Sequence, residues 1–310
     1  MGILIDERTT FIIQGITGRE AVNMTRECLD YGSKVVGGVT PGRGGRDVYG
    51  VPVYDTIKEI IAREKVDGSV ITVPAPFVRD AAFEAIENGI KLLVIVTERT
   101  PRYEVAQVLE FARLRGTRVI GPNCLGIITP GKAKMGGIGG PAANTKQAYK
   151  AGRIGIMSRS GGMTTEIANS LTAAGLGQST AVSIGGDPLI GSTYAELMPL
   201  FEADEGTDAL VIYTEPGGPM DAQLSLWVKE NKSRLPIVAF MAGKFMDKMP
   251  GMRFGHAGTI VEGKADTAAE KLERLAEAGI SVAEEISQIP DLVREKLGQA
   301  TRDRRQETGG

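Results

Sequence analysis

Short β-branched runs alternate with helix-like segments along the whole chain of 310 residues, and this alternation restricts the fold more than any other feature. Apolar runs separated by helical patterns are typical of parallel strands covered by helices on both faces of a sheet. The sequence predicts strands at residues 11–15, 34–39, 68–73, 91–97, 118–121, 153–157, 180–184, 209–215, 237–242 and 280–283. In the first half it predicts helices at residues 19–31, 76–88 and 102–115. We therefore expect an α/β protein made of doubly wound parallel sheets.

The length indicates two domains, because 310 residues exceed what one core usually holds and about 150 residues per domain is typical. The strand–helix scheme predicts a first domain at residues 1–130 and a second at residues 153–300. Residues 131–152 are rich in Gly, Pro, Ala and Asn and lack periodicity, which indicates a linker or an irregular interface segment. Residues 301–310 are polar and charged, so we expect a disordered tail.

Composition excludes several classes of protein. The net charge of −2 gives no basic footprint for nucleic acid. No apolar run approaches the roughly 18 residues needed to span a membrane, and Asp6, Glu7 and Arg8 argue against a secretory signal. Cys28 and Cys124 make neither a disulfide framework nor a zinc site, so no metal site is expected in this chain. We expect a reducing compartment, either the cytoplasm or the mitochondrial matrix if a presequence has been removed.

The first predicted strand ends in a glycine turn, residues 15–20, that opens a helix. Free N–H groups and the helix dipole make such a turn a phosphate-binding place. The second strand is followed by the basic loop 40–46 with Arg43, where a dinucleotide site would normally have a carboxylate. This domain therefore suits a phosphate-rich nucleotide without a nicotinamide. Residues 73–77 and 96–98 end later strands at the same edge and should line the same crevice.

The second domain holds the only histidine of the chain, His256, in a loop with Gly255 and Gly258. Any chemistry that needs a neutral-pH base, an imidazole nucleophile or a phosphate carrier must use it. Residues 158–162 precede a predicted helix and would hold an anion. A nucleophilic imidazole needs one nitrogen held by an acceptor, and either Glu215 or Asp187 could be that acceptor.

Two other interpretations compete with a phosphate carrier. Residues 258–265 resemble a P-loop, but Ala265 lacks the hydroxyl that ligates magnesium and no apolar strand precedes the segment. A serine hydrolase is the stronger alternative, because Ser160, Asp187 and His256 follow a hydrolase triad in chain order. Against it, Ser158 replaces the first glycine of the nucleophile elbow, and the phosphate-ready first domain has no use in such an enzyme.

Six segments resemble, in order and spacing, the motifs of a known family: residues 14–18, 36–45, 120–124, 158–161, 185–188 and 255–258. Over nearly its full length the chain resembles the alpha subunit of succinyl-CoA synthetase and its relatives, the ADP- or GDP-forming acid–CoA ligases. The resemblance implies an N-terminal Rossmann-like CoA-binding domain followed by a flavodoxin-like ligase domain.

The resemblance also implies a mechanism and a partner. ATP or GTP with Mg²⁺ would be bound mainly by an ATP-grasp beta subunit, in an alpha–beta heterodimer or heterotetramer. It would phosphorylate His256, and the phosphohistidine would activate a small carboxylic acid, so that coenzyme A displaces phosphate from the acyl phosphate. Glu215 matches the carboxylate that pairs with the histidine. The implied CoA contacts are Thr17, Gly18, Arg19, Glu20, Arg43, Pro74, Val96, Thr97, Glu98, Asn123 and Cys124. The implied contacts to the phosphoryl group and acid are Ser158, Ser160, Gly161, Gly162 and Thr165.

The chain departs from succinate-specific members at several of these positions. Thr165 replaces a tyrosine near the acid, and Leu125 and Pro216 replace a proline and an isoleucine of the family motifs. Gly162-Met163 and residues 253–256 are more similar to the citrate-activating branch, citryl-CoA synthetase and ATP-citrate lyase. A smaller residue at position 165 would leave room for a larger acid. The acid therefore stays open between succinate, citrate, malate and others, and without a cleavage domain the chain would at most form citryl-CoA.

Overall fold

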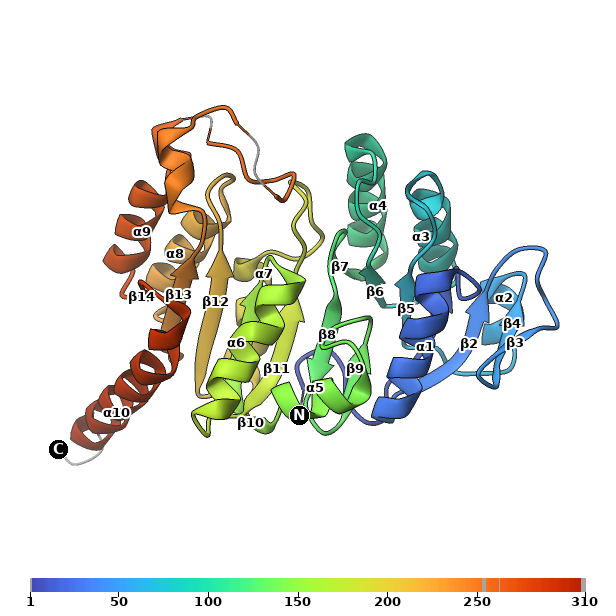
Figure 1. The fold of residues 1–310 in the computed structure, drawn as a ribbon, viewed down its shortest axis with the longest axis horizontal. Helices are drawn as coiled ribbons and strands as arrows, with labels where there is room; N and C mark the ends of the chain where they lie inside the picture. Colours follow the sequence, from blue (N-terminus) through green and yellow to red (C-terminus); the bar gives the residue numbers. More distant parts are fainter. Residues whose placement is uncertain (1, 253–254, 262, 308–310) are drawn as a thin grey trace.

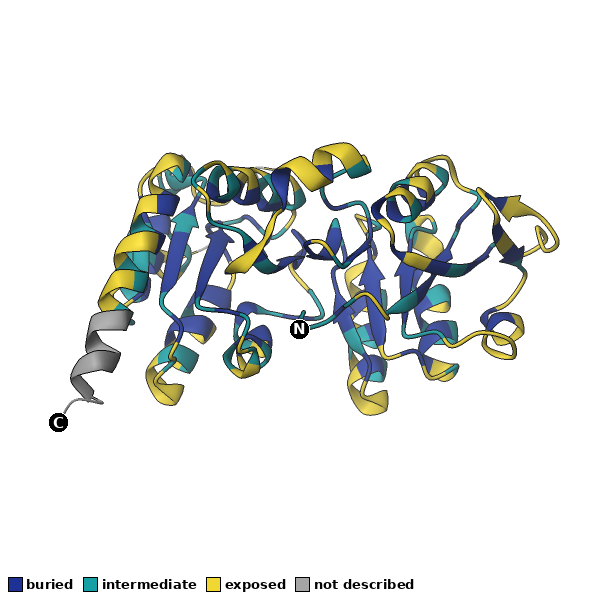
Figure 2. Ribbon diagram, turned by 90° about the horizontal axis from the view of Figure 1, so that it is seen from below, coloured by how far each residue is buried: buried dark blue, intermediate teal, exposed yellow. Residues whose placement is uncertain are grey.

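Two seven-stranded sheets lie side by side in the computed structural model, which describes residues 2–252, 255–261 and 263–307 (Figure 1). Helices cover the faces of both sheets, and the strands between them are largely buried (Figure 2). The predicted α/β fold with two mostly parallel sheets is confirmed. No helix in the described ranges combines the length and apolar character required to cross a membrane.

The first sheet has the order β3-β4-β2-β1-β5-β6-β7, and its neighbours are parallel except for β3 and β4. Its strands are β1 (Thr10–Gln14), β2 (Lys34–Val39), β3 (Asp47–Val48), β4 (Val51–Tyr54), β5 (Gly68–Ile71), β6 (Leu92–Ile95) and β7 (Arg118–Ile120). Its helices are α1 (Arg19–Tyr31), α2 (Ile57–Ile61), α3 (Val78–Glu87) and α4 (Arg102–Arg115), with a 3-10 turn η1 (Ala75–Phe77). The chain runs outward from β1 to β2 and later returns to the other side of β1 as β5. Ligands of open α/β sheets bind at such a switch point, at the carboxyl ends of the strands.

The second sheet has the order β14-β13-β12-β10-β11-β8-β9. Its strands are β8 (Gly126–Thr129), β9 (Ala133–Met135), β10 (Ala151–Ser158), β11 (Gln178–Ser183), β12 (Ala209–Thr214), β13 (Ile237–Met241) and β14 (Ser281–Ala283). Its helices are α5 (Ala142–Ala148), α6 (Gly161–Ala173), α7 (Tyr194–Ala203), α8 (Met220–Asn231), α9 (Ala268–Glu277) and α10 (Ile289–Glu307), with 3-10 turns η2 (Lys244–Lys248), η3 (Lys264–Asp266) and η4 (Ile286–Gln288). Here the switch point lies between β10 and β12, so the loops after these strands meet there.

The segment between the predicted domains differs from expectation. Residues 131–152, predicted as a linker or an irregular interface segment, contain β9, α5 and the beginning of β10. Strand β8 belongs to the second sheet, although its residues lie in the predicted first domain. Strands β8 and β9 pair antiparallel along the edge of β11. Ile127 and Ile128 are fully buried there, so this short hairpin covers a sheet edge that would otherwise be open.

The C-terminal segment also differs from the predicted disorder. Helix α10 continues to Glu307, and residues 308–310 lie outside the described residues. The segment 301–307 contains Arg, Gln and Glu, which are good helix formers, and it extends a helix that already begins at Ile289.

Candidate active site

The imidazole of His256 is paired with the carboxylate of Glu215. His256 Nδ1 lies 2.8 Å from Glu215 Oε2, and the two side chains are 26% and 11% exposed. Because a carboxylate only accepts, Nδ1 donates, and the lone pair is left on Nε2. Glu215 follows the buried strand β12, and its Oε1 accepts a hydrogen bond from the Tyr213 hydroxyl at 3.3 Å. Of the two carboxylates considered as the acceptor, the structure brings Glu215 onto the ring.

The loop of His256 packs on the glycine turn after β11. A Cβ atom at Gly186 would lie 2.5 Å from the imidazole ring, so only glycine leaves room for the histidine. The Gly258 amide donates to Gly186 O at 3.3 Å, and the Thr259 amide donates to His256 O at 3.1 Å. The described part of the segment between β13 and α9, which carries His256, arches over the carboxyl ends of the strands of the second sheet (Figure 1). The glycine-rich strand ends singled out in the sequence therefore converge at the histidine.

Asp187 is held by Asn123, which also connects the two domains. The Asn123 amide group donates to Asp187 Oδ1 at 3.0 Å. The backbone of Asn123 donates to Thr97 O at 3.0 Å and accepts from the Gly186 amide at 3.0 Å. Burial raises the pKa of Asp187, the Asn123 bond opposes this, and the nearby Glu98 carboxylate raises it further. Glu98 of the first domain thus lies close enough to influence the histidine site.

The loop before α6, predicted to hold an anion, is fixed by hydrogen bonds within itself. Ser160 is the N-cap of this helix, and its hydroxyl accepts from the Met163 amide at 3.4 Å. Ser158 is fully buried, and its hydroxyl bonds both the amide and the carbonyl of Ser160. A Cβ at Gly161 would lie 2.2 Å from Leu125, whereas Gly162 faces open space. The first amides of a helix lack partners within the helix, which is the property on which the predicted phosphoryl contact depends.

The predicted substrate residue Thr165 has its hydroxyl 3.0 Å from the Tyr149 hydroxyl. Tyr149 is only 2% exposed, and burial raises the pKa of its hydroxyl. The threonine therefore hydrogen bonds to a buried tyrosine of the chain itself.

The hydrolase triad is not assembled by these contacts. In the described part of the chain, Ser160 caps α6, Asp187 is bonded by Asn123, and His256 Nδ1 is bonded by Glu215. The order of the three residues in the sequence is thus not reproduced as a hydrogen-bonded relay.

Two buried cations at the site were missed by sequence reasoning. Arg159 is 2% exposed and donates through Nη2 to Gly186 O at 3.0 Å and Asp187 O at 3.1 Å. Lys271 is 1% exposed and contacts the turn after Glu215. Lys271 falls in register with the buried Ala268 and Leu275 on α9, and this placement of a charge at core positions was the available signal.

A crevice in the first domain is lined by some of the residues predicted to contact CoA. A cavity of 490 Å³ lies at the ends of β1, β2 and β5, and Thr17, Gly18 and Pro74 are among its lining residues. Arg19 and Glu20 are exposed and pair with each other at 3.2 Å, and Arg43 is also exposed. Val96 and Thr97 are half-buried, and Glu98 is exposed beside them.

Cys124 lies beneath the site rather than on its surface. It is 3% exposed, its thiol donates to Ile95 O at 3.2 Å, and burial raises its pKa to about 12. This sulfur is therefore a neutral core group. Its neighbour Asn123 presents the polar side chain at this border.

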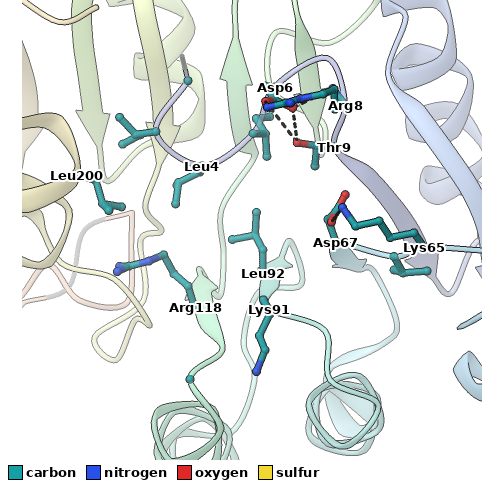
Figure 3. Close-up of a pocket in the computed structure, with 15 residues that line it drawn as sticks. Leu4, Asp6, Arg8, Thr9, Lys65, Asp67, Lys91, Leu92, Arg118 and Leu200 are labelled. Atoms are coloured by element: carbon teal, nitrogen blue, oxygen red, sulfur yellow. Dashed lines mark hydrogen bonds and ion pairs between the residues drawn. The ribbon is translucent and has the colours of Figure 1, made fainter. Parts of the chain in front are cut away.

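A larger cavity, of 840 Å³, lies at the amino ends of the strands of the first sheet, opposite the predicted CoA crevice (Figure 3). Leu92 and Arg118, which begin β6 and β7, line it together with the N-terminal segment. Asp6 binds Arg8 and Thr9 there, and Lys65 pairs with Asp67 at 2.7 Å. None of the predicted site residues lines this cavity.

Comparison with known proteins identifies the family. Residues 6–99 match the family described as "CoA binding domain", and residues 157–281 match "CoA-ligase". The succinate–CoA ligase [ADP-forming] subunit alpha 1 of Archaeoglobus fulgidus is 43% identical over 297 residues, covering 96% of this chain and 99% of that protein. The chain belongs to the succinate–CoA ligase alpha-subunit family. The resemblance drawn from the six motifs is thereby confirmed, and the chain is a CoA ligase subunit.

Other relatives carry different substrate names. The malate–CoA ligase subunit alpha of Methylorubrum extorquens is 41% identical over 304 residues, covering 97% of this chain and 100% of that protein. Among solved structures, ATP citrate lyase of Methanosaeta concilii in complex with (3S)-citryl-CoA superposes with a TM-score of 0.89 at 26% identity. That match covers 97% of this chain and 51% of the lyase chain, so this chain spans about half the length of the lyase.

Proposed function

We propose that this chain is the alpha subunit of an ADP- or GDP-forming carboxylic acid–CoA ligase in which His256 carries the phosphoryl group. The observation that carries the proposal is the 2.8 Å pair of His256 Nδ1 and Glu215 Oε2 among three glycine turns. The pair fixes the tautomer in which Nε2 is the nucleophile.

The reaction divides into three transfers. His256 Nε2 attacks the terminal phosphorus of the nucleotide, a P–N bond forms, and the P–O bond to the nucleoside diphosphate breaks. A carboxylate oxygen of the acid then attacks phosphorus, and the P–N bond breaks to leave an acyl phosphate and free imidazole. The CoA thiolate attacks the acyl carbon, and inorganic phosphate leaves. Covalent catalysis of this kind replaces one difficult condensation by easier steps.

Glu215 supports the first two transfers through charge. Phosphorylation of Nε2 makes the ring cationic while Nδ1 keeps its proton, and the carboxylate compensates that charge. The amides at the N-terminus of α6, at Gly161 and Gly162, are suited to receive the phosphoryl oxygens. The Gly186 turn keeps the ring in one position.

Coenzyme A would occupy the first-domain crevice. The 490 Å³ cavity and the uncapped N-terminus of α1 suit an adenine nucleotide with several phosphates, and the exposed Arg43 can meet one of them. Asn123 and Glu98 stand between this crevice and His256, which is where the thiol must arrive.

A beta subunit would supply the nucleotide. The relatives are named "subunit alpha", which implies a second subunit, and we assign ATP or GTP with Mg²⁺ to an ATP-grasp partner. We expect the complex, a heterodimer or heterotetramer, to work in the cytoplasm, where the free Cys28 and Cys124 stay reduced.

Succinate is the leading acid, because it is named in the relatives with 43% and 44% identity. Citrate and malate are the alternatives, favoured by the lyase superposition and by the malate–CoA ligase relative. The small Thr165, which replaces a tyrosine of the succinate-specific motif, leaves both open.

The test is co-expression with the beta-type partner, followed by an assay of CoA-dependent ADP or GDP release with succinate, malate and citrate. We expect release with at least one acid and none for His256→Ala. A serine hydrolase would instead show fluorophosphonate labelling of Ser160 and no nucleotide turnover. A binding regulator would bind CoA without any phosphate transfer, and either result would overturn the proposal.

A further inference from the structure

We propose that Lys271, together with Asp221, is a positioning residue that holds Glu215 on His256 and so sets the imidazole tautomer. The inference rests on the proposed role of His256, which it deepens. Neither residue belongs to the motifs that identified the site. Among the interactions of the described residues, neither side chain contacts the imidazole.

Lys271 and Asp221 form a buried ion pair below the active site. Their side chains are 1% and 2% exposed, and Lys271 Nζ lies 2.5 Å from Asp221 Oδ2. Nζ also donates to Gly217 O at 2.8 Å and to Gly218 O at 2.9 Å. An ammonium has three donors, so every one of them is used.

These contacts bracket Glu215 on both sides along the chain. On one side, the Thr214 hydroxyl donates to Asp221 Oδ1 at 2.6 Å. On the other, Lys271 binds the carbonyls of Gly217 and Gly218. One buried pair therefore fixes the backbone before and after the carboxylate that touches His256.

The same turn supports the histidine loop. Gly217 has a φ of 89°, and a Cβ there would lie 2.6 Å from Gly258 O and 2.7 Å from Ile260 O. The backbone that Lys271 holds is thus in direct contact with the segment just after His256. A displacement of this turn would move both members of the His256–Glu215 pair.

A role in stability alone does not account for this arrangement. Buried ion pairs add little net stability, because the loss of hydration offsets their attraction, and apolar residues of similar size often replace them without harm. Lys134 offers a matched comparison: it is fully buried, lies 3.6 Å from Glu27, and donates to Gly140 O. Its partners join α1 to the β9 region, outside the histidine site.

The single histidine makes a direct test possible, because the imidazole ¹⁵N signals of the whole chain arise from His256 alone. The chain, purified with a tag free of histidine, would be compared as wild type, Lys271→Met/Asp221→Asn, Thr214→Val and the control Lys134→Met/Glu27→Gln. For wild type and control we expect the ¹⁵N pattern of a neutral ring protonated at Nδ1. For Lys271→Met/Asp221→Asn we expect a mixture of tautomers, and for Thr214→Val a smaller change in the same direction.

Phosphorylation with the beta partner gives the second readout. We expect the double variant at 271 and 221 to phosphorylate about 10–100-fold more slowly, as when other histidine-orienting partners are removed. A folded double variant with the wild-type tautomer and the wild-type rate overturns the inference. If the double variant does not fold, an unchanged tautomer in Thr214→Val overturns it. A wild-type chain that takes no phosphate contradicts the proposed function instead, since the tautomer measurement needs no phosphate.

Discussion

The histidine site and the first-domain crevice of this molecule are built differently. In the second domain, His256, Asp187 and Arg159 are all held by hydrogen bonds to other parts of the site. In the first domain, the side chains expected at the nucleotide crevice, such as Arg43 and Glu98, are exposed. A covalent carrier needs its orientation before the substrate arrives, whereas a bound nucleotide can order exposed side chains as it binds. Substitutions at the histidine site should therefore slow phosphorylation, and substitutions in the first-domain crevice should weaken nucleotide binding.

The largest effect is expected for Glu215→Gln. An amide no longer favours the proton on Nδ1 or compensates the charge of the phosphorylated ring, so phosphorylation of His256 should slow by about 10³–10⁴-fold. Rapid-quench measurement of phosphohistidine checks this, with CoA affinity as the unaffected control. Phosphorylation at the wild-type rate would show that the pair does not orient the ring.

A smaller loss is expected for Gly186→Ala. Its Cβ would meet the imidazole at 2.5 Å and displace it, and a shift of about 1 Å lowers rates roughly 100-fold. Gly263→Ala is the matched control, because a Cβ there meets nothing within 4 Å. Equal rates for the two variants would contradict the tight fit of the ring.

In the first domain, Arg43→Ala should change binding and leave His256 phosphorylation untouched. Loss of one charged contact to a phosphate is worth about 1.5–3 kcal/mol, so the KM for CoA should rise about tenfold or more. Arg46→Ala, in the same exposed loop, is the control. If Arg43→Ala slows phosphorylation instead, the histidine site and the first-domain crevice do not have separate roles.

The smallest effect concerns the pH dependence of stability. Burial raises the pKa of Asp187 above the value of 3.8 expected in the unfolded chain. The folded chain therefore holds this proton more tightly, and the free energy of unfolding should fall as pH rises through the raised pKa. Asp187→Asn removes this contribution, so wild type should lose stability relative to the variant between pH 3.8 and the raised pKa. Urea unfolding at a series of pH values measures the difference, and parallel pH curves would contradict it.

The parts of the fold that could be predicted are those with a strong local pattern. Strands such as β5 and β12 are continuous buried runs, and short runs of this kind between helical patterns are visible in the sequence. Strands β8 and β9 have four and three residues; β8 begins at Gly126 and β9 is followed by Gly136, and both glycines have a positive φ. Their assignment depends on the pairing of β8 with β11, which is far away in the sequence, and of β9 with β8. No local pattern carries that information.

The same limit applies to the site. His256 stood out because it is the only histidine, and Glu215 because it closes an apolar strand. The residues alone left the acceptor open between Glu215 and Asp187, since both follow parallel strands at one edge. The family resemblance implied Glu215, and the structure places that carboxylate on the ring. Arg159 and Lys271 donate to backbone carbonyls. Because every residue has a backbone carbonyl, the sequence does not show which ones a buried cation binds. The core position of Lys271 on its helix marks it as unusual in the sequence, but only the fold shows which groups such a cation holds.

The most direct test of the central claim is a chase of the isolated phosphorylated chain. The chain is labelled with [γ-³²P]ATP or GTP in the presence of the partner, separated from free nucleotide, and mixed with the acid and CoA. We predict acid-labile, base-stable label on His256 that is released as inorganic phosphate only when both acid and CoA are present. Label that resides on another residue, or that remains on His256 through the chase with every acid tested, would contradict the account.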